Sequence, residues 1–290
     1  MKKIKLLLAL ILLVLTLTFV GCKKNDELKE IKVAASDVPH AEILNAIKDL
    51  LKEKGYDLKV TILDWQEQNA AVVAGDYDAN YFQHEPYLLA DTSANGLKMY
   101  AKVHYEPLGI YKGKSTSNTA ADGTTFEICD DSSNGVRAFQ LLFASGVLDE
   151  EVEKANNNFP YDEATSTFTF TSNSWTSSNG KVVTLVSEDL LVARLNDYDF
   201  ALLPCNTALT GGISASTRVY VESDPTQLTT KANGIAARVN DYNNDEEYKS
   251  KIDALCDVLL SKEVEEIVKE KYNGVIICDS STQIDLRNSK

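Results

Sequence analysis

The residues from Asn80 to Leu88, in the order Asn-Tyr-Phe-Gln-His-Glu-Pro-Tyr-Leu, bring three aromatic rings, two amides and an imidazole into one short window. A surface loop has no need of so many rings, and a core strand has no need of so many amides. The mixture suits a pocket in which rings pack on an apolar side chain while polar groups fix its other end through directed hydrogen bonds. These residue types therefore indicate the binding of a small molecule.

A second polar group, from Asp130 to Arg137, follows a predicted strand at 125–129 and opens a predicted helix at 135–145. A helix N-terminus presents free N–H groups and a partial positive charge, and a guanidinium in its first turn can hold a carboxylate through two parallel hydrogen bonds. Arg137 is therefore a candidate for binding the carboxylate of a ligand. The alternative is a surface ion pair between Arg137 and Asp130 or Asp131.

An α/β unit must position the first group. Residues 31–35 predict a short buried strand, and residues 58–62 alternate apolar and polar side chains as a second strand. Between them, a helix begins near Pro39 and ends at Gly55. This β–α–β order predicts a parallel sheet. A further strand at 77–82 places the aromatic window at its C-terminal end, where ligands bind in open α/β sheets.

The rest of the chain predicts a second α/β unit and a return to the first. Residues 112–123 are rich in Ser, Thr, Asn and Gly and predict a crossing. Residues 200–204 read as a buried strand of the second unit, and residues 218–222 as the return crossing. Two amphipathic helices within 246–272 are expected to pack back on the first unit. The predicted domains are lobe 1, made of residues 31–111 and 223–290, and lobe 2, made of residues 112–222.

The N-terminus reads as a targeting segment rather than as part of the fold. Basic residues precede an apolar run at 6–20, and Gly21-Cys22 closes that run. The run is short for a membrane span and is followed at once by polar sequence. We interpret residues 1–21 as a lipoprotein signal peptide, Cys22 as the acylated residue, and residues 22–30 as a tether. The alternative is an ordinary signal peptide with an incidental cysteine.

The formal net charge of −14 argues against nucleic acid as a partner and against electrostatic docking on anionic lipid. The cysteines show no metal-binding spacing, and neither do His40, His84 and His104, so the sequence predicts no metal and no cofactor. Cys256 and Cys278 could form a disulfide or remain free buried thiols.

The aromatic window resembles the motif Asn-x-Phe-Gln-His-x-Pro-Tyr-Leu of the NlpA/MetQ family, the methionine-binding lipoproteins of ABC importers. The segment 130–137 is similar to the family's Asn-Asp-Pro-Thr-Asn-x-x-Arg, with Asn134 and Arg137 in register. The segment 103–111 resembles a third family segment. The resemblance runs from about Val33 to Gly274. It implies a bilobal, periplasmic-binding-protein-like fold of type II.

The resemblance also implies a set of ligand contacts between the lobes. Glu106 is expected either to oppose the ammonium of the ligand or to be a carboxylate at the surface of the hinge. Asn206 lies a residue or two later than the corresponding family Asn, because Pro204 and Cys205 occupy that position. The contacts expected on this basis are Phe82, His84, Tyr87, Asn134, Arg137, Asn206, Tyr81, Glu106 and Asn233.

The implied function is that of a receptor on the outer face of the cell membrane, anchored by lipid at Cys22. It would bind a small amino acid, most often methionine in this family, and deliver it to an ABC permease without catalysis. The alternatives are a different amino acid or a short peptide on the same scaffold, a metal-binding protein or metallohydrolase, and a surface adhesin. The departure of Pro204-Cys205-Asn206 from the family pattern is the sequence feature that supports a ligand other than methionine.

Overall fold

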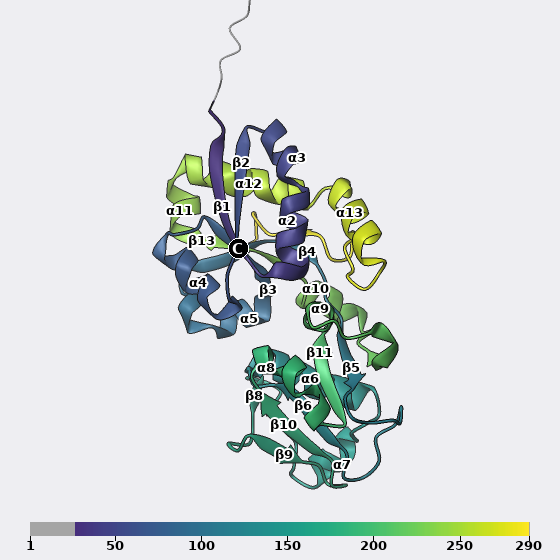
Figure 1. Cartoon of the computed structure of the whole chain (residues 1–290). Helices are drawn as coiled ribbons and strands as arrows, with labels where there is room; N and C mark the ends of the chain where they lie inside the picture. Colours follow the sequence, from purple (N-terminus) through teal and green to yellow (C-terminus); the bar gives the residue numbers. More distant parts are fainter. Residues whose placement is uncertain (1–26, 290) are drawn as a thin grey trace, which may run out of the picture.

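The computed structural model describes residues 27–289 and folds them into two lobes, each built on a mixed six-stranded sheet (Figure 1). The predicted signal peptide and Cys22 lie outside the described residues. Within those residues, no helix is both long and apolar enough to cross a membrane. The predicted α/β fold with two lobes is confirmed.

The first lobe contains a sheet with the strand order β14-β4-β13-β3-β1-β2. Strand β1 pairs in parallel with β2 and with β3, which confirms the predicted β–α–β unit. Strand β13 inserts between β3 and β4 and runs antiparallel to both. The strands are β1 (Lys29–Ala35), β2 (Tyr56–Ile62), β3 (Ala79–His84), β4 (Leu97–His104), β13 (Asn233–Arg238) and β14 (Ile284–Asp285).

The helix predicted between β1 and β2 is divided into η1 (Asp37–Ala41), α2 (Glu42–Ala46) and α3 (Lys48–Glu53). It keeps one apolar face, because Ile43, Leu44, Ile47 and Leu51 are all fully buried. Gly55 follows the last turn with a φ of 90°, a left-handed conformation that glycine adopts without strain. The remaining helical elements of this lobe are α4 (Trp65–Ala74), α5 (Glu85–Ala90), η2 (Thr92–Ala94), α11 (Val239–Asn244), α12 (Glu246–Leu259) and α13 (Lys262–Tyr272).

The second lobe contains a sheet with the strand order β12-β5-β11-β6-β10-β9 and a separate β7–β8 hairpin. The strands are β5 (Leu108–Lys112), β6 (Thr125–Cys129), β7 (Tyr161–Asp162), β8 (Thr167–Phe168), β9 (Ser174–Thr176), β10 (Val182–Val186), β11 (Phe200–Pro204) and β12 (Arg218–Val221). The helical elements are α6 (Ser132–Ala144), α7 (Glu150–Ala155), α8 (Glu188–Arg194), η3 (Leu195–Asp197), α9 (Cys205–Thr210) and η4 (Ala215–Thr217).

The first crossing lies earlier than the sequence suggested. Strand β4 ends in one sheet and β5 begins at Leu108 in the other, so the crossing is made by residues 105–107. The predicted boundary at residue 111 therefore falls inside β5, which pairs with both β11 and β12. The polar stretch at 112–123 is a loop of the second lobe. The return crossing leaves β12 and reaches β13 through α10 (Pro225–Thr230).

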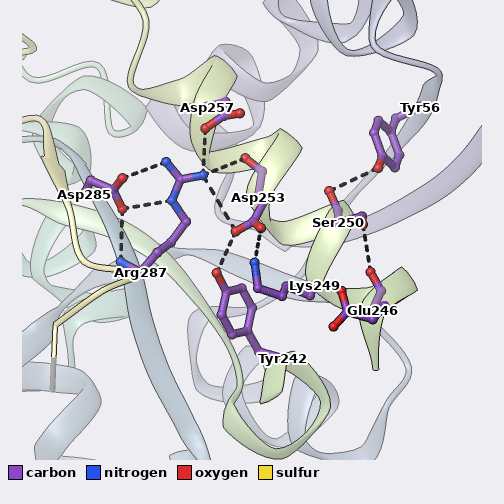
Figure 2. A network of polar contacts seen from close by, with 9 residues as sticks. All are labelled: Tyr56, Tyr242, Glu246, Lys249, Ser250, Asp253, Asp257, Asp285 and Arg287. Carbon is purple, nitrogen blue, oxygen red and sulfur yellow. Dashed lines mark hydrogen bonds and ion pairs between the residues drawn. The ribbon is translucent and has the colours of Figure 1, made fainter. Parts of the chain in front are cut away.

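The C-terminal segment is fastened to the first lobe by a polar network around Arg287 (Figure 2). The guanidinium binds both carboxylate oxygens of Asp285 and reaches Asp257 on α12 at 2.7 Å. Helices α12 and α13 contribute apolar residues to the core of the first lobe, as predicted. Within this packing, Cys256 and Cys278 are free, buried thiols.

Candidate functional site

A cleft of about 370 Å³ lies between the lobes and is lined by residues from both. Its size is in the range of small-molecule sites, which are about 300–1,000 Å³. Eight of the nine residues predicted to contact a ligand line it, namely Phe82, His84, Tyr87, Glu106, Asn134, Arg137, Asn206 and Asn233. Topology therefore brings together side chains that are spread over much of the sequence.

Three aromatic rings form one wall of the cleft. Phe82 lies near the end of β3 and Tyr87 in α5, and their ring centroids are 5.8 Å apart at an interplanar angle of 75°. Trp65 opens α4 and meets Tyr87 edge-on, with centroids 5.6 Å apart. Each ring is partly exposed to the cleft. The sequence pattern had not marked Trp65 as a contact, although a tryptophan directly after a helix N-cap residue was a visible signal.

The two amides of the aromatic window hold the wall in place, and one of them, Gln83, also lines the cleft. Asn80 donates to Asn69 of α4 at 2.8 Å, and Gln83 donates to Asn80 at 2.9 Å. Asn69 in turn donates to Gln83 at 3.0 Å and to Asp91 at 2.8 Å. These buried amides satisfy one another and fix α4, which carries Trp65, against β3.

Tyr81 does not line the cleft, and its predicted contact with the ligand is wrong in this structure. Successive side chains of a strand point to opposite faces, so the neighbour of Phe82 turns away from the cleft. The Tyr81 ring is fully buried and its hydroxyl bonds to Nδ1 of His104. Burial raises the pKa of Tyr81 well above its usual value, so the hydroxyl stays protonated.

His84 makes a direct polar contact between the lobes. It is the N-cap residue of α5, and its Nδ1 accepts a hydrogen bond from the backbone of Tyr87 at 3.2 Å. Its Nε2 lies 3.1 Å from Oδ1 of Asn134 on α6. Burial and the positive charges of Lys231 and Arg137 hold the pKa of His84 well below its usual value. The imidazole is therefore neutral and donates through Nε2.

Arg137 lies in the second turn of α6, because this helix begins at Ser132, three residues before its predicted start. It pairs neither with Asp130 nor with Asp131. Its Nε is 3.1 Å from both carboxylate oxygens of Glu222, and its Nη2 donates to the backbone oxygen of Glu106 at 2.8 Å. Arg137 therefore joins the second lobe to both crossing segments.

The contact between Arg137 and Glu222 keeps both side chains charged although they are buried. Burial alone would lower the pKa of Arg137, but the Glu222 carboxylate outweighs burial and raises it. Burial would likewise raise the pKa of Glu222, but Arg137 lowers it below its usual value. Glu222 also accepts hydrogen bonds from the Tyr105 hydroxyl and from the Leu108 backbone at 3.2 Å.

Asn206 and Asn233 reach the cleft from opposite lobes. Strand β11 ends at Pro204 and α9 begins at Cys205, so Asn206 is the second residue of that helix. Its Oδ1 is buried and has no hydrogen-bond partner among residues 27–289. Asn233 is the first residue of β13 and is buried at the cleft. The loop that departs from the family pattern therefore still presents an amide to the cleft.

The sequence analysis missed several charged residues of the cleft, and Lys231 and Glu188 are the most buried of these. Lys231 caps the end of α10, and burial and Arg137 lower its pKa to about 8. Its ammonium forms no hydrogen bond or ion pair within the part of the chain that the structure describes. Glu188 opens α8, where burial and the Asp131 carboxylate raise its pKa to about 7. Both side chains lie at element ends, where a single sequence gives no periodic signal.

A model of the NlpA lipoprotein family matches residues 31–278. The chain belongs to the NlpA lipoprotein family. It is 33% identical over 285 residues to the methionine-binding lipoprotein MetQ of Bacillus subtilis, which covers 94% of this chain and 98% of that relative. It is 27% identical over 270 residues to the membrane lipoprotein TpN32 of Treponema pallidum, covering 91% and 92% of the two chains.

A solved structure of a nutrient-binding protein from Burkholderia cenocepacia, bound to methionine, superposes with a TM-score of 0.69. The match covers 86% of this chain and 99% of that one at 25% identity. The predicted family is thereby confirmed. As a member of the NlpA family, the chain is a solute-binding lipoprotein and not an enzyme.

The Arg137–Glu222 pair predicts a large and specific loss of stability. Arg137→Met should lower the free energy of unfolding by about 3–5 kcal/mol, because it leaves the buried carboxylate of Glu222 without its partner. Adding Glu222→Gln should recover part of that loss, since a neutral amide is less costly to bury. Urea unfolding of the single and double variants measures both effects.

Lys32→Met is the matched control, because Lys32 pairs with Glu30 at 3.5 Å on an exposed surface. It should cost less than about 1 kcal/mol. A double variant no more stable than Arg137→Met alone would contradict the assigned role of the pair.

Proposed function

We propose that this chain is a lipid-anchored receptor on the outer face of the cell membrane that binds methionine in the cleft and delivers it to an ABC permease. The observation that carries the proposal is the division of the cleft into an aromatic wall and a polar end. Rings suit a thioether side chain, since sulfur packs favourably against aromatic edges. The names of the Bacillus and Burkholderia relatives support the same ligand.

The polar end of the cleft offers partners for both charged groups of an amino acid. Lys231 supplies a positive charge without a partner in the described chain, and Arg137 lies beside it but is neutralised by Glu222. We infer that the ligand carboxylate lies against Lys231. The α-ammonium of the ligand would face Glu106 and the buried Oδ1 of Asn206. His84, Asn134 and Asn233 complete the proposed set of contacts, with Phe82 and Tyr87 at the side chain.

An amino acid or short peptide with a cationic side chain is the second candidate ligand. Its support is the number of carboxylates around the cleft, which outnumber the basic groups there. Asp64 and Asp189 are exposed at the cleft, and Glu188 lies deeper. A longer cationic ligand could reach this acidic rim from the aromatic wall.

Calorimetric titration of the purified chain with amino acids tests the ligand. Methionine should bind, and Tyr87→Ala should weaken its affinity at least about tenfold, because the side chain loses one ring of its wall. Leu89→Ala, which changes an 80% exposed residue of the same helix, should leave the affinity unchanged. Preference for lysine or arginine over methionine would favour the second candidate, and no binding of any amino acid or short peptide would reject both.

The pH dependence of binding tests the placement of the carboxylate. A ligand carboxylate at Lys231 needs the charged ammonium, so the affinity should fall as the pH rises from 7 to 9 through the pKa of about 8. Arg137 opposes this charge, while Glu222 and Asp131 favour it. Lys231→Gln should lower the affinity at pH 7 about tenfold or more.

Lys231→Gln is also the control for the other groups that titrate in this pH range, namely those of the ligand and Glu188. Any pH dependence that remains in this variant comes from those groups. The fall between pH 7 and pH 9 should be smaller in Lys231→Gln than in the unaltered chain. Parallel pH profiles for the two proteins would place the carboxylate elsewhere.

The proposed anchor is Cys22, and its test needs cells. The unaltered chain should be found in the membrane fraction and carry labelled fatty acid, whereas Cys22→Ser should lose both, because the acyl chains are attached through that thiol. If the receptor serves a permease, the released variant should also reduce methionine uptake at low concentration. Retention of Cys22→Ser in the membrane with its label would refute the anchor.

A further inference from the structure

Three polar side chains of the first lobe meet behind the cleft. His40 lies in η1, His104 ends β4, and Glu106 lies in the first crossing. The two histidines are fully buried and Glu106 is nearly so. Their ligand atoms all lie within 4.8 Å of one another. The sequence analysis considered His40 and His104 as metal ligands and set them aside because their spacing matches no metal motif, but the fold brings them together with Glu106.

One carboxylate oxygen lies between the two imidazoles. Oε1 of Glu106 is 2.8 Å from Nε2 of His104 and 3.4 Å from Nε2 of His40. Ligands at about 2.0–2.1 Å from a tetrahedral zinc ion are about 3.3 Å from one another. The two distances from Oε1 lie on either side of this value, and the two imidazole nitrogens lie within 4.8 Å of each other.

His40 is the side chain that the surrounding protein leaves unexplained. Neither of its ring nitrogens has a hydrogen-bond partner within residues 27–289, although the ring is fully buried. Leaving a buried polar group unpaired costs about 1–3 kcal/mol. The neighbouring rings of Tyr81 and His104 meet the His40 ring edge-on at centroid distances of 4.9 Å. Neither ring forms a hydrogen bond with a His40 nitrogen. A cation at Nε2 would give one of the two nitrogens a partner.

The ring of His104 is oriented by a hydrogen bond at the nitrogen that faces away from Glu106. The hydroxyl of Tyr81 bonds to Nδ1 of His104, which leaves Nε2 directed at Glu106. Histidines that bind metals are commonly oriented by a hydrogen bond at the other ring nitrogen. In the ligating form, His104 would carry its proton on Nδ1 and donate it to the Tyr81 oxygen.

We propose that His40, His104 and Glu106 form a binding site for a divalent transition-metal ion of the zinc type. Two imidazoles and one carboxylate are donors that suit zinc rather than magnesium or calcium, which prefer oxygen ligands. Glu106 also lines the cleft, so an ion entering from the cleft meets this carboxylate first. The ion would take up the Glu106 carboxylate that the proposed function places opposite the ligand's ammonium, so the zinc test is made without an amino-acid ligand.

The test uses the mature chain from residue 23 onward, which contains both lobes, after removal of metal by a chelator. Dialysis against zinc followed by elemental analysis should give about one zinc ion per chain. His40→Ala and His104→Ala should each abolish this binding, and cobalt(II) should give a visible absorption band that the same variants lose. Tyr81→Phe keeps the ring but removes the support of His104, and should weaken zinc binding about 10–100-fold.

Cys129→Ser is the matched control. Cys129, Asp131 and Glu188 form another group whose ligand atoms lie close together, so zinc bound there would be lost in this variant and kept in His40→Ala. Circular dichroism of every variant shows whether it is folded, and His40→Gln replaces His40→Ala if that variant unfolds. Absence of zinc from the unaltered chain, or zinc retained after both histidine substitutions, would overturn the proposal.

Discussion

The arrangement of the two lobes depends on one buried ion pair. Arg137 projects from a helix of the second lobe and is held by Glu222, which lies where the chain leaves that lobe. The same guanidinium binds the backbone of Glu106 in the other crossing. A buried pair is seldom a large net gain in stability, but breaking it is costly. Its consequence is therefore geometric: the two crossings and helix α6 are held in register.

That constraint shapes the chemistry of the cleft. An arginine at this position would by itself be the strongest carboxylate receptor on the wall, but Glu222 already satisfies its planar donors. In the proposed function, the positive charge that meets the ligand carboxylate is that of Lys231, whose pKa is lowered because it is buried beside Arg137. Glu222 thus makes Arg137 an anchor of the hinge, and the proposal assigns the carboxylate to the neighbouring lysine.

The sequence predicted the elements that depend on local pattern. The predicted strands at 125–129 and 200–204 coincide with β6 and β11, since short apolar runs between turn residues identify buried strands. The crossing was misplaced because composition made 112–123 look like a linker, whereas the sheet that β5 joins is set by distant partners. Phe82, His84 and Tyr87 were predicted to line the cleft through the motif of the aromatic window, which lies at the end of a strand.

What the sequence could not show is how polar side chains are shared between recognition and support. In the aromatic window, Phe82 faces the cleft while Tyr81 faces the interior, because a strand turns successive side chains to opposite sides. The amides of Gln83 and Asn80 form hydrogen bonds with each other and with Asn69.

The rigidity of the aromatic wall follows from this division. Rings that hold a ligand must not rotate away from it, and the buried amides fix the helix that carries Trp65 against the strand that carries Phe82. Truncating Asn80, which is fully buried and does not line the cleft, would leave a donor of Gln83 unpaired and loosen the wall. The amides of this window therefore contribute to binding through the position of the rings.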